Sequence, residues 1–251
     1  MASPQQTLSH MRSLRLPTMA EIYQSQLRRP EIQEMSFDER LGILFDSEVT
    51  ARANSRIKRL IKTAGLPEFA TLEEIDWRAT RGLDKKLIDA LSTCEWVGNN
   101  LNIMVLGATG VGKTWLACAF GTAVCRNKMS VLFWRCTELY AQIARTMLDG
   151  TLPKFKAKLS QTQVLVLDDI GLGELTVPVA NVLLEIIDKR HRTGSLIITS
   201  QFPVEDWHRF IPDPTLADAI LDRIVHKAHR IPLKGESLRK IYGRKKMEAE
   251  D

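Results

Sequence analysis

The sequence contains no long hydrophobic run and little cysteine. A membrane-spanning helix needs about 18 consecutive apolar residues, and no such run occurs, so we expect no association with a membrane. Residues 1–30 lack the apolar core of a secretory signal. The four cysteines form no C-x-x-C pair, which favours reduced thiols in a cytosolic protein over a disulfide framework.

Internal repeats and low-complexity linkers are also absent, and aromatic residues make up only 6% of the chain. The 251 residues are 44% hydrophobic and 26% charged, which is typical of a globular protein. This length suits one full α/β domain with a smaller appendage. The 35 Lys+Arg exceed the 30 Asp+Glu and give a net charge of +5, which is compatible with a polyanionic partner.

Residues 1–66 show helical patterns only. Ser36 followed by Glu39 has the spacing of a capping box, which marks the start of a helix. The helix that follows is expected to end at Gly65, before Pro67. Its apolar residues follow helical spacing and predict one apolar face: Leu41, Leu44, Phe45 and Val49.

From about residue 100 the pattern changes to short β-branched or leucine-rich runs that alternate with helical segments. The strands are expected at 102–106, 131–134, 164–167, 196–199 and 229–233. The helices are expected at 114–126, 137–148, 177–192 and 215–225. Such alternation predicts an α/β fold, with a mainly parallel sheet of five strands and helices on both faces.

Residues 107–114 match G-x-x-x-x-G-K-[ST] at every fixed position, between an expected strand and an expected helix. Glycines let successive backbone N–H groups converge on phosphate oxygens, and the helix N-terminus adds its positive end. Lys113 would reach the outer phosphates, and Thr114 would place its hydroxyl on Mg²⁺. The alternative is a chance glycine-rich turn, which this context makes rare. The predicted ATP-binding residues are Gly107, Ala108, Thr109, Gly110, Val111, Gly112, Lys113 and Thr114.

A second candidate lies where the apolar run 164–167 ends in Asp168 and Asp169. The chain between this run and the phosphate loop holds two helical segments and a strand, so the acidic strand can lie beside the phosphate-loop strand. Asp168 would then bind Mg²⁺, directly or through water. Asp169 would orient the attacking water. The alternative is a pair of exposed turn carboxylates.

Several motifs together resemble the IstB-type ATP-binding helper proteins of bacterial insertion sequences. They are GATGVGKT, VLVLDDIG, IITSQFPVEDW, DPTLADAILDRIVHKAHRI and, nearer the start, LRLPTMAEIY and ARANSRIKRL. These proteins are AAA+ ATPases, similar to DnaC-type helicase loaders and DnaA-type initiators. The resemblance implies an N-terminal helical domain at 1–66, an AAA+ domain at 67–243 with a reduced or absent lid, and a charged tail at 244–251.

The resemblance also implies roles for single residues around the ATP. Ser200 and Gln201 stand where AAA+ proteins keep a polar sensor of the γ-phosphate; alternatively, Ser200 caps the turn before Pro203. Arg223 stands where the family has its arginine finger, which one subunit inserts into its neighbour's site. Alternatively it is a surface arginine paired with Asp218 or Asp222.

Two further positions follow from the same resemblance. Arg239 could be a second arginine sensor for the ATP. Trp77 lies in a segment that resembles the one flanking the nucleotide base, and it can equally be part of the core.

Three basic clusters are candidates for DNA contacts, because phosphate contacts need only positive charge and reach. The N-terminal cluster is Arg52, Arg56, Lys58, Arg59 and Lys62. The second is Arg145, Lys154, Lys156 and Lys158. The third is segment 223–246, with nine Lys/Arg and one acid. Each alone can be a solvated face. The family resemblance favours the second, because AAA+ relatives that act on DNA carry an extra helical element in that interval, directed into the central channel.

The resemblance implies an ATPase of the bacterial cytoplasm that uses ATP and Mg²⁺. It would form a homo-oligomer with ATP at subunit interfaces, assemble on double-stranded DNA with little sequence preference, and recruit the cognate transposase. A helicase loader that acts on single-stranded DNA is the alternative within the same fold. A pure interaction protein with a degenerate ATP site is an alternative of another class, against which the intact Lys113, Thr114 and Asp168 argue.

Overall fold

The computed structural model describes residues 3–77 and 81–238, which divide into two compact units between Arg59 and Leu60. The helices are α1 (Pro4–Ser13), α2 (Pro17–Arg28), α3 (Phe37–Ala64), α4 (Lys85–Ser92), α5 (Glu95–Gly98), α6 (Lys113–Arg126), α7 (Cys136–Leu148), α8 (Leu152–Gln161), α9 (Val177–Arg190) and α10 (Pro214–Val225). The strands are β1 (Asn102–Leu106), β2 (Val131–Arg135), β3 (Val164–Ile170), β4 (Ser195–Ser200) and β5 (Ala228–Pro232). In this part of the chain no helix is long and apolar enough to cross a membrane.

The N-terminal unit consists of α1, α2 and most of α3. The predicted capping box is present, since Ser36 Oγ accepts from the Glu39 N–H at 3.2 Å and Glu39 Oε2 accepts from the Ser36 N–H at 2.8 Å. The expected apolar face of α3 is not a buried stripe, however. Leu44 is buried, whereas Phe45 is 54% exposed and Val49 is 65% exposed. So small a unit has too little interior to cover every apolar position of a long helix.

The second unit contains the predicted five-stranded sheet, in which all the pairings are parallel. The strand order is β2-β3-β4-β1-β5. The expectation that the acidic strand lies beside the phosphate-loop strand is therefore wrong, because β4 lies between β3 and β1. The carboxyl ends of all three strands still meet at one edge of the sheet, where ligands bind in folds of this kind.

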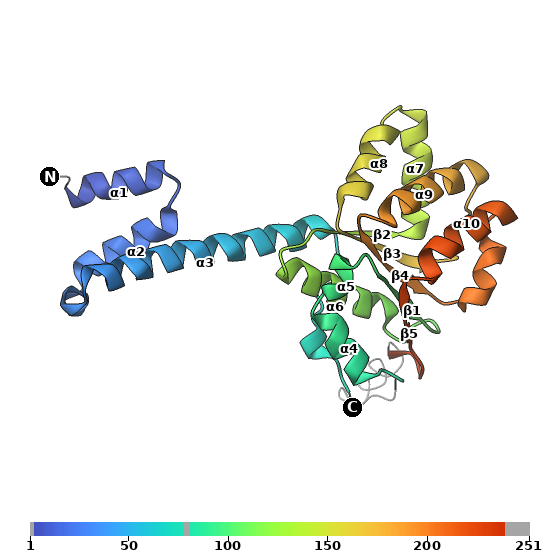
Figure 1. Cartoon of the computed structure of the whole chain (residues 1–251), viewed down its shortest axis with the longest axis horizontal. Coiled ribbons are helices and arrows are strands. Elements are labelled where there is room, and N and C mark those ends of the chain that lie inside the picture. The colour runs from blue at the N-terminus through green and yellow to red at the C-terminus, as the bar shows by residue number, and fades with distance from the viewer. Residues whose placement is uncertain (1–2, 78–80, 239–251) are drawn as a thin grey trace, which may run out of the picture. The chain divides into compact units, whose positions relative to one another are not determined.

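Helices cover both faces of the sheet, as Figure 1 shows. Ile103 and Val105 of β1 pack with α4, α5 and α6, whereas Met104 between them packs with α7, α9 and α10 on the other face. This alternation explains the continuous apolar runs, because a strand buried on both faces has no polar side. The four cysteines, which are buried free thiols, belong to these layers.

Candidate functional site

The phosphate loop connects β1 to α6 and takes backbone conformations that favour glycine. Gly110 and Gly112 have positive φ angles of 85° and 99°. A Cβ added at Gly107 would lie 2.3 Å from the backbone oxygen of Leu233, and one at Gly110 would lie 2.2 Å from Ser237 Oγ. No larger side chain fits at either position, so the loop keeps the open backbone cradle that phosphate binding requires.

Lys113 and Thr114 begin α6 directly after this cradle. The Lys113 side chain is buried, and its Nζ donates to the backbone oxygen of Ala108 at 3.0 Å. The ammonium therefore lies over its own loop, where a phosphate would lie. Thr114 Oγ1 donates to the two carboxylate oxygens of Asp168 at 3.0 and 3.1 Å. This contact links the phosphate loop to the acidic strand across the intervening β4.

Asp168 is only 1% exposed, and the hydroxyls of Thr114 and Thr199 donate to it, the second at 2.7 Å. Burial raises the pKa of Asp168, while the hydrogen bond from Thr199 acts in the opposite direction. A buried carboxylate gains from a bound cation. Carboxylate and hydroxyl oxygens are the ligands that Mg²⁺ prefers, so these residues fit the predicted metal. The alternative of two exposed turn carboxylates does not hold for Asp168.

Asp169 follows at an irregularity in β3, where the register with β4 shifts between Leu167 and Ile170. Its φ of 57° is in the left-handed region, which costs free energy for a residue other than glycine. Thr199 stabilises this conformation, because its hydroxyl accepts a hydrogen bond from the Asp169 N–H at 2.8 Å. Asp169 is half-buried, at the same strand end as Asp168.

The hydroxyl that contacts both aspartates thus belongs to Thr199, which sequence reasoning missed. Ser200 Oγ instead donates to the Ile170 oxygen at 3.1 Å and accepts from the Phe202 N–H at 3.1 Å. The alternative interpretation of Ser200, a cap on the turn, is the one that the geometry supports. Strand alternation could have identified Thr199, because it shares a side with Gln201 rather than with Ser200.

Gln201 reaches the phosphate loop, since its Oε1 accepts a hydrogen bond from Thr109 Oγ1. The structure therefore brings the Gln201 side chain to the phosphate loop.

Arg223 lies on α10, and its hydrogen bonds lead away from the chain's own phosphate loop. Its Nε donates to Asp188 Oδ1 of α9 at 2.6 Å, and its Nη1 donates to the Ala219 oxygen at 2.8 Å. The expected alternative partners, Asp218 and Asp222, instead contact His208 and His226. Arg239 lies outside the described residues.

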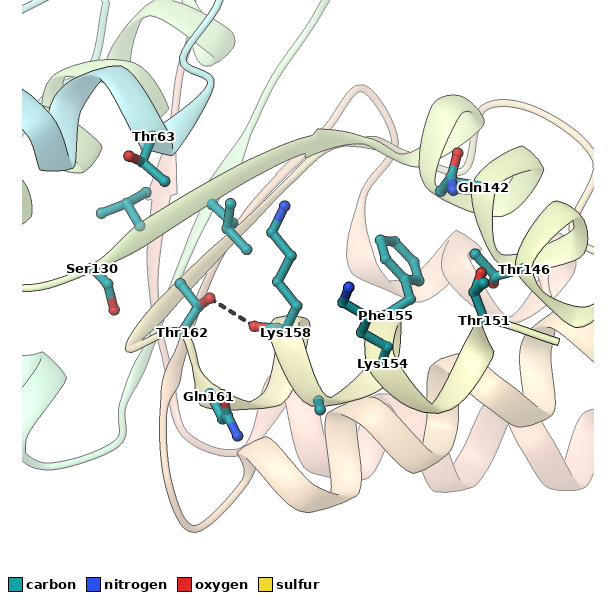
Figure 2. Close-up of a pocket in the computed structure, with 13 residues that line it drawn as sticks. Thr63, Ser130, Gln142, Thr146, Thr151, Lys154, Phe155, Lys158, Gln161 and Thr162 are labelled. Carbon is teal, nitrogen blue, oxygen red and sulfur yellow. Dashed lines mark hydrogen bonds between the residues drawn. The ribbon is translucent and has the colours of Figure 1, made fainter. Parts of the chain in front are cut away.

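The basic residues of α8 divide between two faces. Lys156 forms an ion pair with Glu185 of α9. Lys154, Phe155 and Lys158 lie together along a groove (Figure 2). The groove has a volume of about 730 Å³ and is also lined by residues 130–132, at the start of the outer strand β2. Arg145 is exposed on the preceding helix, α7. Structure therefore brings Lys154 and Lys158 together and separates Lys156 from them.

One residue of the N-terminal basic cluster, Arg52, forms hydrogen bonds within its own unit. Arg52 donates to Glu48 at 2.9 Å and to the backbone oxygen of Arg15 at 2.6 Å. Arg56 and Arg59 line a groove of about 340 Å³ between α2 and α3. Of the predicted DNA contacts here, Arg52 thus has a structural role that the sequence did not indicate.

Trp77 is not part of the core, because its side chain is 41% exposed. It lines a groove against the second half of α6, with Ala119, Ala123 and Arg126. Lys85 Nζ lies 5.8 Å from the centre of its ring. The phosphate loop is at the other end of that helix.

Comparison with known proteins gives the same picture as the geometry. A family model described as "IstB-like ATP binding protein" matches residues 9–249. A protein of Sinorhizobium fredii named as an insertion sequence ATP-binding protein, y4pL, is 41% identical over 239 residues, which cover 95% of this chain and 98% of that protein. A crystal structure of DnaI matches with a TM-score of 0.56 and 24% identity, over 66% of this chain and 91% of its own. The replication initiator DnaA, bound to AMPPCP and single-stranded DNA, matches with a TM-score of 0.57 and 17% identity, over 73% and 56%. These two structures share the AAA+ fold with the chain.

Proposed function

The chain belongs to the IstB-like ATP-binding proteins of insertion sequences, and from this premise we propose that it is an ATPase that assembles on duplex DNA and recruits a transposase. The observation that carries the proposal is the contact of Thr114 with the buried Asp168. It joins the phosphate loop to a carboxylate with the chemistry to hold Mg²⁺. A degenerate nucleotide site would have no reason to keep that pair.

For hydrolysis, the residues have distinct roles. Lys113 binds the outer phosphates in exchange for its bond to the Ala108 oxygen. Thr114 and Asp168 would hold Mg²⁺, which when bound would offset charge on the phosphate oxygens. Asp169 orients the attacking water, and Gln201 contacts the terminal phosphate. Ser200, which we expected as a sensor, supports this arrangement through the turn that it caps.

Arg223 completes the site of a neighbouring subunit as its arginine finger. The supporting observation is that its contacts are to α9 and its own helix, away from the chain's own loop. Mixing Arg223→Ala with Asp169→Ala subunits tests this role. The mixture should recover hydrolysis to about a quarter of wild type, because only one order of a mixed neighbouring pair is complete. No recovery above the two separate variants would contradict action between subunits.

Duplex DNA lies along the basic face of α7 and α8. Lys154 and Lys158 line one groove with Phe155, and Arg145 is exposed on the adjacent helix. Ammonium and guanidinium groups contact phosphates without reading bases, so the binding is largely independent of sequence. Arg56 and Arg59 of α3 add a second basic surface in the N-terminal unit.

The N-terminal helical domain contributes protein contacts, either between subunits or with the transposase. Its exposed apolar side chains are unusually large for a surface that meets only water: Leu14, Phe37, Phe45 and Val49. We keep residues 1–66 as this domain, 67–243 as the ATPase domain and 244–251 as a charged tail.

Fluorescence anisotropy with labelled DNA tests the proposed function. The wild type should bind duplex DNA more tightly with ATP than with ADP, and Lys113→Ala should lose that difference. Lys189→Ala, an exposed lysine of α9, is the matched control and should keep it. The chain on duplex DNA should then retain the transposase encoded beside it in a pull-down. A preference for single-stranded DNA, with no retained transposase, would favour a helicase loader instead.

A further inference from the structure

Arg81 lies against the phosphate loop, although β1 begins only at Asn102. Its Nη1 would be 3.5 Å from a Cβ placed on Gly112. The backbone at this position is fixed, because the Lys234 N–H donates to the Arg81 oxygen at 2.8 Å. Lys234 follows β5, so Arg81 approaches the loop from the β5 side of the sheet.

The surroundings of the Arg81 guanidinium are positive. Gly112 is the residue before α6, and the N-terminus of a helix carries a partial positive charge. The next residue is Lys113, whose ammonium is buried over the same loop. An anion bound at this point would be attracted by the Arg81 guanidinium and by the N-terminus of α6.

The hydrogen-bonding capacity of Arg81 also remains open. Within the described residues its Nε is buried and has no hydrogen-bond partner. Among the same residues, the buried Nε of Arg190 also has no partner, but the two Nη groups of Arg190 donate to four backbone oxygens and hold that guanidinium in a structural position. A buried donor without a partner costs free energy, so a site next to Arg81 is suited to an acceptor of negative charge.

The strand order decides which part of the nucleotide this acceptor is. Asp168 of β3 and Gln201, which directly follows β4, are the residues proposed above for the metal and the terminal phosphate, and both strands lie on one side of β1. Arg81 lies on the other side, towards β5. We propose that Arg81 binds the non-transferred α- and β-phosphates of the nucleotide, a role that rests on nucleotide binding at the phosphate loop.

Fluorescence titration of the full chain with MANT-ATP and MANT-ADP tests this role. Arg81→Ala should weaken binding of both nucleotides about tenfold, because a charge-assisted hydrogen bond to each is lost. Arg81→Lys should recover part of the affinity, since it restores the charge without the planar fork. Arg126→Ala is the matched control, because it removes the same charge at the far end of α6. It should leave both affinities within about twofold of wild type.

Thermal unfolding separates a binding role from a structural one. Without nucleotide, Arg81→Ala should unfold at the wild-type temperature or higher, because the variant removes a buried Nε–H donor that has no partner among the described residues. With ADP, its stabilisation should be smaller than that of wild type. A lower unfolding temperature without nucleotide, combined with unchanged affinities, would make Arg81 structural. A loss confined to MANT-ATP would contradict the assignment to the non-transferred phosphates.

A Lys113→Ala arm separates this inference from the proposed function. If wild type binds and Lys113→Ala does not, the loop is the nucleotide site and the Arg81 titrations decide the role of Arg81. If wild type binds neither nucleotide, both the ATPase function and the role of Arg81 are wrong.

Discussion

The strand ends of the sheet and helix α8 place their charged side chains in opposite ways. At the strand ends, Thr114 of α6, Asp168 of β3 and Thr199 of β4 come from separate elements and meet through hydrogen bonds of 2.7–3.1 Å. On α8, three lysines that are close in sequence diverge, since Lys154 and Lys158 share a groove while Lys156 pairs with Glu185. The pairing of β3 with β4 places Asp168 beside Thr199. On α8, helical periodicity and the contact with α9 direct Lys156 away from Lys154 and Lys158.

The largest expected effect comes from Asp168→Asn, which removes the negative charge that the Thr114 and Thr199 hydroxyls contact. Steady-state hydrolysis of ATP should fall about a thousandfold, because the site loses the carboxylate proposed to hold Mg²⁺. The same variant should unfold about 2–4 °C higher without nucleotide, because a buried charge is gone. If Asp168→Asn hydrolyses ATP at the wild-type rate, Asp168 and the residues around it are not the catalytic centre.

The pH dependence of this variant follows from the raised pKa of Asp168. As pH rises above the ordinary value of 3.8, the unfolded state ionises first, and wild type loses stability relative to the variant. The stability gain of Asp168→Asn should therefore be largest at neutral pH and shrink towards pH 4. A constant gain across this range, measured by denaturation in urea, would contradict burial as the cause.

The next effect concerns Arg190, which anchors α8 to the sheet. This side chain is 1% exposed, and it donates to the oxygens of Leu159, Thr162, Gln163 and Ser195 at 2.6–3.1 Å. Burial lowers its pKa to about 10, still far above neutral pH. Arg190→Met should cost about 3 kcal/mol in the free energy of unfolding, because several backbone oxygens lose their donor. Lys189→Met, on the exposed side of α9, should cost little, and equal losses would contradict the anchoring role.

A smaller effect separates two neighbours at the end of β4. Thr199→Val should lower kcat about tenfold, because Asp168 loses a donor and the Asp169 N–H loses its acceptor. Ser200→Ala should change kcat less than about twofold, since the hydrogen-bond partners of its hydroxyl are backbone groups of Ile170 and Phe202 rather than an aspartate side chain. A reversed order of the two effects would return the sensor role to Ser200.

The last prediction concerns DNA binding by the three lysines of α8, Lys154, Lys156 and Lys158. Replacing Lys154 and Lys158 together with Gln should weaken duplex DNA binding about tenfold and reduce the salt slope of binding by about 2. Lys156→Gln should leave both unchanged, because that ammonium already pairs with Glu185. Anisotropy titrations over a range of salt concentrations measure both quantities. Equal effects for all three lysines would show that the helix face does not decide DNA contact.

Much of the site could be predicted because its residues lie at the ends of strands that the sequence pattern identifies. The phosphate loop is a local motif whose glycines impose the backbone, and Asp168 follows a recognisable buried strand. Thr199 was missed because Thr199, Ser200 and Gln201 are consecutive polar residues and the resemblance pointed to the last two, whereas the alternation of sides along β4 separates Thr199 from Ser200. Arg81 escaped because nothing in its local sequence indicates that it reaches Gly112.

The sequence did not indicate α4, α5 or α8, but by itself it determined the order of the five strands and of α6, α7, α9 and α10, the phosphate loop and the acidic strand end. These depend on periodicity and on backbone conformations that neighbouring residues impose. Tertiary structure alone decided that β4 separates β3 from β1, and that Arg223 pairs with Asp188. Such contacts join segments far apart in the chain. Their geometry depends on how whole layers pack, which no local pattern of residues encodes.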